Sequence, residues 1–246
     1  MYPYLLHSGH LSIPTFGVLA AVGLMLALLL SQRTAAWVGL APDEVWDAGL
    51  SAVIAAFVLS RLLLVVENVH SFLQAPLLLL MVPSLTATGM AATLVVMLIW
   101  LRRKHLPVWK VLDAWAPCAT LTWAFLALGH FAEGSDAGLP ARFGIRMPGE
   151  STPLHPVALY VAFYALLLTD GLLYWLRRRR PAVGGVTAAA LFAAGVGQFL
   201  IGFLRQPDMF GSTSMLDPLQ WVSVGMMLAG AVVYVLTTPA EEASLV

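Results

Sequence analysis

Residues 111–131, VLDAWAPCATLTWAFLALGHF, decide what class of protein this chain belongs to. The stretch holds one acidic residue, Asp113, close to its start, and no Lys or Arg. An α-helix of about 20 mostly apolar residues crosses the roughly 30 Å hydrocarbon core of a bilayer. The stretch therefore predicts a membrane-spanning helix. We expect Asp113 to form either a structural pair with Lys110 or a contact at a helix N-terminus, where an acid is favourable.

The composition of the whole chain supports a membrane protein. Of its 246 residues, 60% are hydrophobic and 11% are charged, whereas a soluble domain carries about 25% charged residues. The formal net charge is zero, so bulk charge indicates no nucleic-acid or acidic partner. Cys118 is the only cysteine, which excludes an intramolecular disulfide and a cysteine metal cluster. No phosphate-binding loop, dinucleotide motif, zinc-ligand spacing or serine-hydrolase elbow is present, so we expect neither a metal nor a cofactor.

Six further segments are long and apolar enough to cross a membrane, so we expect seven spans. The N-terminal segment lacks the basic region and cleavage pattern of a signal peptide, and we interpret it as a retained span. No internal repeat or linker divides the chain. The expected fold class is therefore all-α, a polytopic membrane helical bundle that forms a single domain over residues 1–246. The spans are expected at residues 12–31, 48–66, 85–101, 111–131, 154–176, 185–204 and 220–237.

Lys and Arg residues lie mostly in alternate loops, which predicts the orientation of the bundle. Nine of them share one side and mark the cytoplasm, because short cytoplasmic loops are enriched in Lys and Arg. The opposite loops hold Arg142, Arg146 and Arg205, and Arg61 lies within the second span. We therefore expect the N-terminus outside and the C-terminus in the cytoplasm. The nine are Arg33, Arg102, Arg103, Lys104, Lys110 and Arg177–Arg180.

Polar residues gather at the expected outer ends of the spans. Arg61 lies about five residues, or roughly 7.5 Å, below the outer boundary of its span. At that depth its guanidinium either extends to the headgroups or faces inward and receives a lipid phosphate. His130 and Glu133 share one helical face at a spacing of three. They are either a catalytic pair or the solvated end of a helix.

Short motifs from about Pro14 to Leu236 resemble those of the bacterial prolipoprotein diacylglyceryl transferases. The resemblance rests on the order and spacing of the motifs and on their placement against seven spans. The motifs are Phe16-Gly17, Ser60-Arg61-Leu62, Asp113 with Ala116-Pro117, Leu128-Gly129-x-Phe131-x-x-Gly134, His155-Pro156-x-x-Leu159-Tyr160, Arg180-Pro181-x-x-Gly184, Arg205-Gln206-Pro207-Asp208 and Gln220-x-x-Ser223.

The resemblance implies a seven-span enzyme of the bacterial inner membrane whose site faces the extracytoplasmic side. Such an enzyme transfers diacylglyceryl from phosphatidylglycerol to the cysteine thiol in the lipobox of a secreted prolipoprotein, and glycerol phosphate leaves. The expected partners are therefore the lipid bilayer, phosphatidylglycerol and the prolipoprotein. The residues expected to take part are Arg61, Arg205, Gly89 and Gly129 in phospholipid binding and His130, Glu133 and His155 in catalysis.

A base must help to deprotonate the thiol, whose unperturbed pKa is about 8.5. A neutral His130 can serve as that base, with Glu133 orienting its ring.

At several positions where the resemblance implies polar residues, this chain has others. A histidine and an arginine of the family are replaced by Ala87 and Ala127, and a second arginine and a glutamate by Gln198 and Gly202. Two functions therefore stay open beside diacylglyceryl transfer. One is a catalytically silent paralogue that binds phospholipid or lipoprotein, or serves as a partner subunit. The other is an enzyme with different lipid-linked chemistry on the same bundle.

Overall fold

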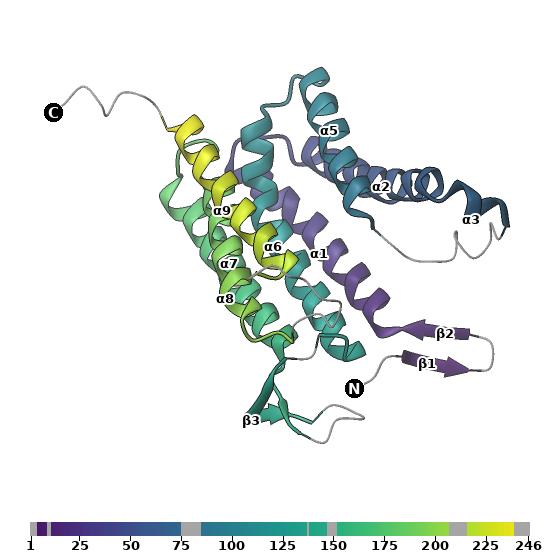
Figure 1. The fold of residues 1–246 in the computed structure, drawn as a ribbon. Helices are drawn as coiled ribbons and strands as arrows, with labels where there is room; N and C mark the ends of the chain where they lie inside the picture. Colours follow the sequence, from purple (N-terminus) through teal and green to yellow (C-terminus); the bar gives the residue numbers. More distant parts are fainter. Residues whose placement is uncertain are drawn as a thin grey trace.

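The computed structural model describes residues 4–8, 11–74, 85–136, 138–146, 152–206 and 216–238. Within these ranges the chain forms a helical bundle with short strands at one end (Figure 1). The helices are α1 (Thr15–Trp37), α2 (Pro42–Glu67), α3 (Val69–Gln74), α5 (Ala87–Arg103), α6 (Val108–Glu133), α7 (Val157–Arg179), α8 (Gly185–Gly202) and α9 (Pro218–Thr237). The strands are β1 (Tyr4–Ser8), β2 (Leu11–Pro14) and β3 (Pro140–Ile145), and β1 pairs with β2 in an antiparallel hairpin.

Each expected span overlaps one helix, and the all-α membrane bundle is confirmed. Six helices, α1, α2, α6, α7, α8 and α9, are long and apolar enough to cross a membrane. The helix α5 has 17 residues, fewer than the about 20 that usually cross the hydrocarbon core. The chain is thus a multi-pass membrane protein. The count of seven spans and the orientation of the termini stay predictions.

Several helices begin ahead of the expected spans, because span prediction counts apolar residues alone. The helix α2 begins at Pro42 instead of residue 48, and its first turn contains Asp43 and Glu44. Acidic side chains are favourable near a helix N-terminus, so a polar first turn can precede the apolar part of one helix. The helix α6 likewise begins at Val108 instead of residue 111.

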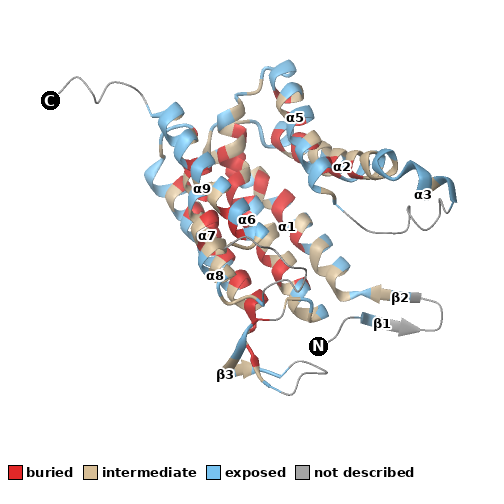
Figure 2. Ribbon diagram, in the orientation of Figure 1, coloured by how far each residue is buried: buried red, intermediate tan, exposed pale blue. Residues whose placement is uncertain are grey.

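The centre of the bundle is built from small residues and buried hydroxyl groups (Figure 2). The helix α6 packs between α1 and α7, and α8 packs on α9 and α7. Gly23 of α1 lies against Phe125 of α6, where a Cβ at position 23 would fall 2.8 Å from the ring carbon Cγ. The Thr34 hydroxyl donates to the carbonyl oxygen of Ala114 at 2.8 Å. In a membrane the hydrophobic effect does not drive helices together, because the lipid tails are as apolar as the side chains. Close packing of small residues and interhelical hydrogen bonds hold the helices together instead.

Asp113 joins α6 to the beginning of α8. Its buried carboxylate accepts the backbone N–H of Gly184 at 2.6 Å and of Thr187 at 2.8 Å, and the Thr187 hydroxyl at 2.7 Å. The expected contact with a helix N-terminus is therefore present, but it is made to α8 and not to α6 itself. Since α6 begins at Val108, Asp113 lies in its second turn, where it faces α8. No ion pair with Lys110 occurs in the described structure.

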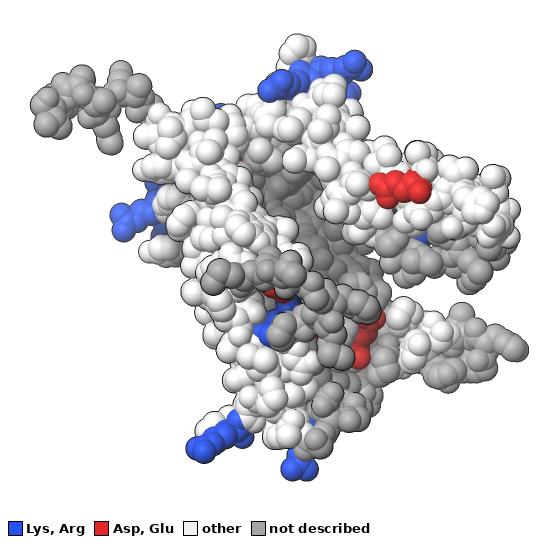
Figure 3. Space-filling model, in the orientation of Figure 1, with Lys and Arg blue, Asp and Glu red and all other residues white. Residues whose placement is uncertain are grey.

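The helices α2 and α5 form a close pair that leans away from the rest of the bundle. Gly89 of α5 is buried against Ser60 of α2, and a Cβ at position 89 would fall 2.7 Å from the Ser60 Cβ. The helix α5 meets α6 around Leu101 and Val111, near their connecting turn. Figure 1 shows α2 and α5 diverging from α6 and α9, and Figure 3 shows the surface hollowed between these two groups of helices.

Charged side chains are unevenly distributed over the surface. Figure 3 shows Lys and Arg side chains near α5, near β3 and at the left edge of the molecule, with a few charged side chains between them, and most of the remaining surface is uncharged. Large apolar side chains such as Phe57 and Phe163 are more than half exposed on the helices. This distribution is typical of a bundle whose middle contacts lipid hydrocarbon.

Candidate functional site

A short segment after α6 holds together the ends of two other helices. The Gly138 N–H donates to His155 O at 3.1 Å, and the His155 N–H donates to Leu139 O at 3.0 Å. The Leu139 N–H donates to Leu204 O at 2.9 Å, and Gly138 forms a β-bridge with Arg205. Two of the expected site residues, His155 before α7 and Arg205 after α8, are therefore held by one backbone segment.

Arg205 makes a partly buried ion pair. Its Nη2 lies 2.9 Å from Asp136 Oδ2, and the two side chains are 17% and 22% exposed. Its Nε is buried and has no hydrogen-bond partner among the described residues. A guanidinium carries five N–H donors. Asp136 therefore orients Arg205 and balances its charge through one of these donors.

His155 is half-buried and contacts a tyrosine of the following helix. Its Nδ1 lies 3.2 Å from the Tyr160 hydroxyl oxygen. The tautomer of a neutral imidazole decides which nitrogen can accept a proton. When Nδ1–H donates to Tyr160, Nε2 is free to act as a base; when the tyrosine donates to Nδ1, Nε2 carries the proton and can donate it.

His130 lies exposed at the end of α6 and faces α1. Its ring packs on Phe16 with the ring centroids 4.9 Å apart, and its Nδ1 lies 3.0 Å from Ser135 Oγ. Glu133 is exposed, and within the described structure it has no hydrogen bond or ion pair with His130. The hydrogen bond that we expected from Glu133 is thus made by Ser135. The reason is that Gly134 turns the chain back at the end of α6, with φ of 77°, and brings Ser135 over the histidine.

Ser135, Asp136 and Gly138 connect three of the expected site residues. Ser135 contacts His130, Asp136 pairs with Arg205, and Gly138 binds the backbone of His155. The structure therefore gathers His130, His155 and Arg205 around one turn at the end of the bundle that carries β3.

The remaining expected residues lie elsewhere or serve in packing. Gly129 is buried against Phe16, where a Cβ would fall 2.6 Å from a ring carbon, and Gly89 is buried between α2 and α5. These contacts explain why both positions are glycine, and a lipid contact stays a prediction for each. Arg61 is half-buried on α2, which packs on α1 and α5, whereas Arg205 follows α8. In Figure 1 the end of α2 that leads to α3 lies apart from α8.

Three of the four replaced polar positions carry a smaller or uncharged residue packed within the bundle, whereas Ala87 is exposed. Ala127 is 4% exposed and packs in an apolar cluster with Val157 and Val161. At Gly202 a Cβ would lie 3.1 Å from the Gln220 side chain. Gln198 keeps a polar group, and its Oε1 is buried with no hydrogen-bond partner in the described parts of the chain. The pattern of charges at this end of α6 and α8 therefore differs from the one that the resemblance implies.

Three residues of the connecting segment are absent from the sequence-based candidates. They are Ser135, Asp136 and Gly138. The signal for them was their position directly after the helix-ending Gly134, since polar residues at a helix end lie where the chain leaves the bundle. Pro207 and Asp208, the end of one quoted motif, lie outside the described residues. No group of three or more His, Cys, Asp or Glu side chains that could hold a metal ion occurs within the described ranges.

Comparison with known proteins identifies the family. The family model for prolipoprotein diacylglyceryl transferase matches residues 3–236. The chain is 24% identical to a phosphatidylglycerol–prolipoprotein diacylglyceryl transferase of Clostridium tetani, over 95% of this chain and 97% of that protein. It is 28% identical to the transferase of Synechococcus elongatus, over 94% of this chain and 86% of that protein. The match to the Bordetella parapertussis transferase, 34% identical over 155 residues, covers 61% of this chain and spans 59% of that relative. The protein therefore belongs to the prolipoprotein diacylglyceryl transferase family.

Proposed function

We propose that this protein transfers diacylglyceryl from phosphatidylglycerol to the lipobox cysteine of secreted prolipoproteins in the bacterial inner membrane. The observation that carries the proposal is the family match over residues 3–236, nearly the whole chain. The clustering of His130, His155 and Arg205 supports it, because the reaction needs a proton acceptor and a cation close together. The predicted orientation puts this cluster on the extracytoplasmic side.

The proposed reaction has defined demands on these residues. The thiol sulfur forms a bond to the glyceryl carbon, the bond from that carbon to the phosphate oxygen breaks, and glycerol phosphate leaves with the electron pair. The thiol proton passes to Nε2 of His130 in the tautomer in which Nδ1–H donates to Ser135 Oγ, while the Ser135 hydroxyl donates to His130 O. Arg205 stabilises the negative charge on the leaving phosphate. His155, held by the same backbone segment that holds Arg205, is the second group for proton transfer.

The lipid has to reach this cluster from the bilayer. The hollow between the α2–α5 pair and the helices α6 and α9 is the proposed entry path (Figure 3). Arg61 lies on α2, half-buried, and serves as a cation for the headgroup. In this proposal Arg61 and Arg205 approach one cavity that takes the anionic headgroup.

Complementation tests the proposed function. A strain depleted of its own transferase should grow when it produces this protein, and should fail to grow when it produces the Arg205→Ala variant at the same membrane level. A wild-type protein that reaches the membrane and does not restore growth would contradict the proposal.

A second candidate is a catalytically silent paralogue that binds phospholipid or lipoprotein. The observation that favours it is the apolar packing around Ala127, because an arginine there would have to displace Val157 and Val161. Such a protein retains phosphatidylglycerol in native mass spectra and forms no thioether product. The two candidates therefore differ in turnover and not in lipid binding.

A further inference from the structure

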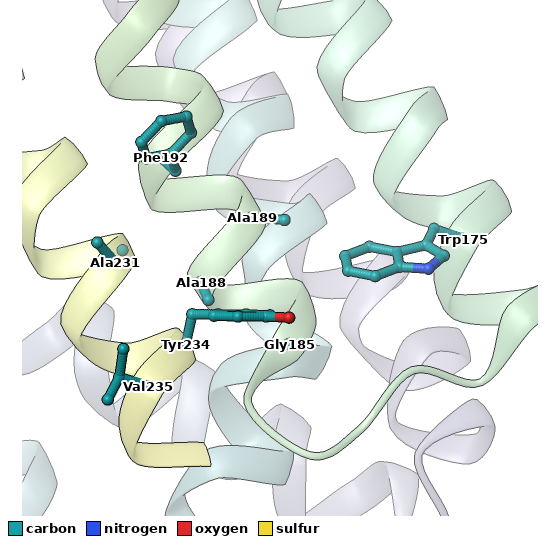
Figure 4. A pocket seen from close by; sticks show the side chains of 9 residues that line it. Trp175, Gly185, Ala188, Ala189, Phe192, Ala231, Tyr234 and Val235 are labelled. Atoms are coloured by element: carbon teal, nitrogen blue, oxygen red, sulfur yellow. The ribbon is translucent and has the colours of Figure 1, made fainter. Parts of the chain in front are cut away.

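An apolar groove lies between α7, α8 and α9, at the end where α8 begins. Its volume is about 400 Å³. Trp175 of α7 and Tyr234 of α9 stand on its two sides, and Figure 4 shows the Tyr234 ring directed towards Trp175. Phe192 closes the groove along α8, and Ala189 and Ala231 are part of its lining. The small side chains let a long, thin apolar group approach both helices.

The groove opens towards the surface of the bundle. Phe192 is 49% and Tyr234 59% exposed, and all three helices are long and apolar enough to cross a membrane. Lipid hydrocarbon therefore borders the opening. Tyr and Trp are enriched at the level of the headgroups, so the pair of rings indicates the boundary between acyl chains and headgroups.

Two arginines continue the Trp175 side of the groove into the headgroup region. Arg178 and Arg179 follow Trp175 by three and four residues, which puts them on its helical face one turn further along α7. Both side chains are exposed, and neither has an ion pair within the described structure. Arginine presents a planar fork of donors that suits a phosphate.

The other two arginines of the same run have different surroundings. The Arg177 guanidinium lies over the Trp37 ring at 5.8 Å, on the side of α1. Arg180 lines a separate pocket with Lys110 and Asp113. Only Arg178 and Arg179 of the run therefore share the face of Trp175.

We propose that this groove binds an anionic glycerophospholipid of the leaflet at the arginine-rich end. One acyl chain lies in the groove beside Ala189 and Ala231, and the phosphate is held by Arg178 and Arg179. The bound lipid bridges α7, α8 and α9. It is distinct from the transferred lipid, because the groove and the proposed site lie at opposite ends of α8. Gly185 at the groove and Gly202 near the proposed site are about 26 Å apart along the helix.

Native mass spectrometry with phosphatidylserine as the probe and phosphatidylcholine as the neutral comparison tests the proposal. The wild-type protein should bind phosphatidylserine more tightly. The double variant Arg178→Gln, Arg179→Gln should weaken phosphatidylserine binding by about fivefold per arginine, the usual effect of one basic residue at a lipid surface. The double variant Ala189→Trp, Ala231→Trp fills the groove and should abolish the bound phosphatidylserine.

Matched controls come from α5 at the same end of the bundle. The double variant Arg102→Gln, Arg103→Gln removes two exposed arginines, and Leu94→Trp adds an indole to an exposed helix face. Both should leave phosphatidylserine binding unchanged. If the groove-filling variant does not fold, as judged by circular dichroism, the arginine variant alone decides.

Three results would overturn the proposal. The first is equal binding of the two lipids by the wild type. The second is a loss of binding in the Arg102→Gln, Arg103→Gln control as large as that in Arg178→Gln, Arg179→Gln. The third is a dimer mass that disappears when the groove is filled. The last result would assign the groove to a second copy of the chain. None of these readouts depends on diacylglyceryl transfer.

Discussion

Arg205 is the residue on which the lipid chemistry depends most. Its ion pair with Asp136 fixes the guanidinium at 2.9 Å from the carboxylate while Nε keeps no partner among the described residues. Arg205→Ala should lower diacylglyceryl transfer by about 10²–10³-fold, the range for removing one donor to developing charge. Rates of transfer to a lipobox peptide provide the measurement.

The Asp136→Asn variant is the control for Arg205. The amide keeps a hydrogen-bond acceptor for Arg205 Nη2 and removes only the negative charge. It should therefore change the rate by less than about tenfold, since only a neutral hydrogen bond replaces the ion pair. A loss as large as that of Arg205→Ala would mean that the charge of Asp136, and not only its position, is required.

His130 is the residue that the proposed proton transfer requires. His130→Ala should lower thiol diacylglyceryl transfer by about 10²–10⁴-fold with the fold intact, the usual range for a general base. Glu133→Gln should change the rate much less, because Ser135 and not Glu133 contacts the ring. Transfer by the two variants, with circular dichroism as the check on folding, is the measurement. Unchanged turnover in His130→Ala together with lost turnover in His155→Ala would move the base to His155.

At the level of single residues, the sequence predicted that His130, His155 and Arg205 lie at one end of the bundle. It did not predict the hydrogen bonds and the ion pair that link them. Topology alone put His130, His155 and Arg205 at the outer ends of their helices. The link between them depends on the turn at Gly134 and on backbone hydrogen bonds of Gly138, which hydropathy does not encode. Gly89 and Gly129 pack closely against Ser60 and Phe16, a role that the sequence did not predict, and their predicted contact with lipid stays a prediction.

At the scale of secondary-structure elements, a substitution in the segment after α6 tests whether this segment holds the ends of α7 and α8 together. A Cβ at Gly138 would fall 2.6 Å from His155 O, in the bridge that holds the ends of α7 and α8. Gly138→Ala should destabilise the protein by about 1–3 kcal/mol, because overpacking forces the backbone to shift. Thermal unfolding in detergent, followed by circular dichroism, measures the loss.

Gly171→Ala is the matched control, since nothing lies within 4 Å of a Cβ at that position of α7. It should leave the stability unchanged or raise it slightly, because alanine favours a helix over glycine. Equal stability of the two variants would show that the segment tolerates a side chain and does not clamp the two helices.

The long apolar helices were predicted well from the sequence, and the shorter elements between them were not. The apolar length of each span was enough to find α1, α2 and the helices from α5 to α9. The short helix α3 and the strands β1 and β3 lie outside the expected spans, where no hydropathy signal exists. The strand β2 (Leu11–Pro14) overlaps the start of the first expected span, because apolar residues alone do not distinguish a strand from the first turn of a helix. The cap that Asp113 forms on α8 joins residues 113 and 187, and a contact over that separation has no local pattern in the sequence.

For the whole molecule, the partition of Lys and Arg between loops predicts seven spans with the N-terminus outside. Reporter fusions should place residues 105 and 179 in the cytoplasm and residue 140 outside. A cytoplasmic signal at residue 140 would contradict the orientation and move the candidate site to the wrong side for a secreted prolipoprotein. A further fusion between α3 and α5, compared with the fusion at residue 105, decides whether α5, with its 17 residues, crosses the membrane.

Transfer by the purified protein tests the proposed function most directly. The wild-type protein in detergent is mixed with phosphatidylglycerol and a lipobox peptide, and the peptide is analysed by mass spectrometry. A gain of one diacylglyceryl group on the cysteine, absent with a peptide that carries serine in its place, is the expected result. Phosphatidylglycerol that stays bound in native mass spectra while no thioether forms would contradict the enzyme and support the silent, lipid-binding paralogue.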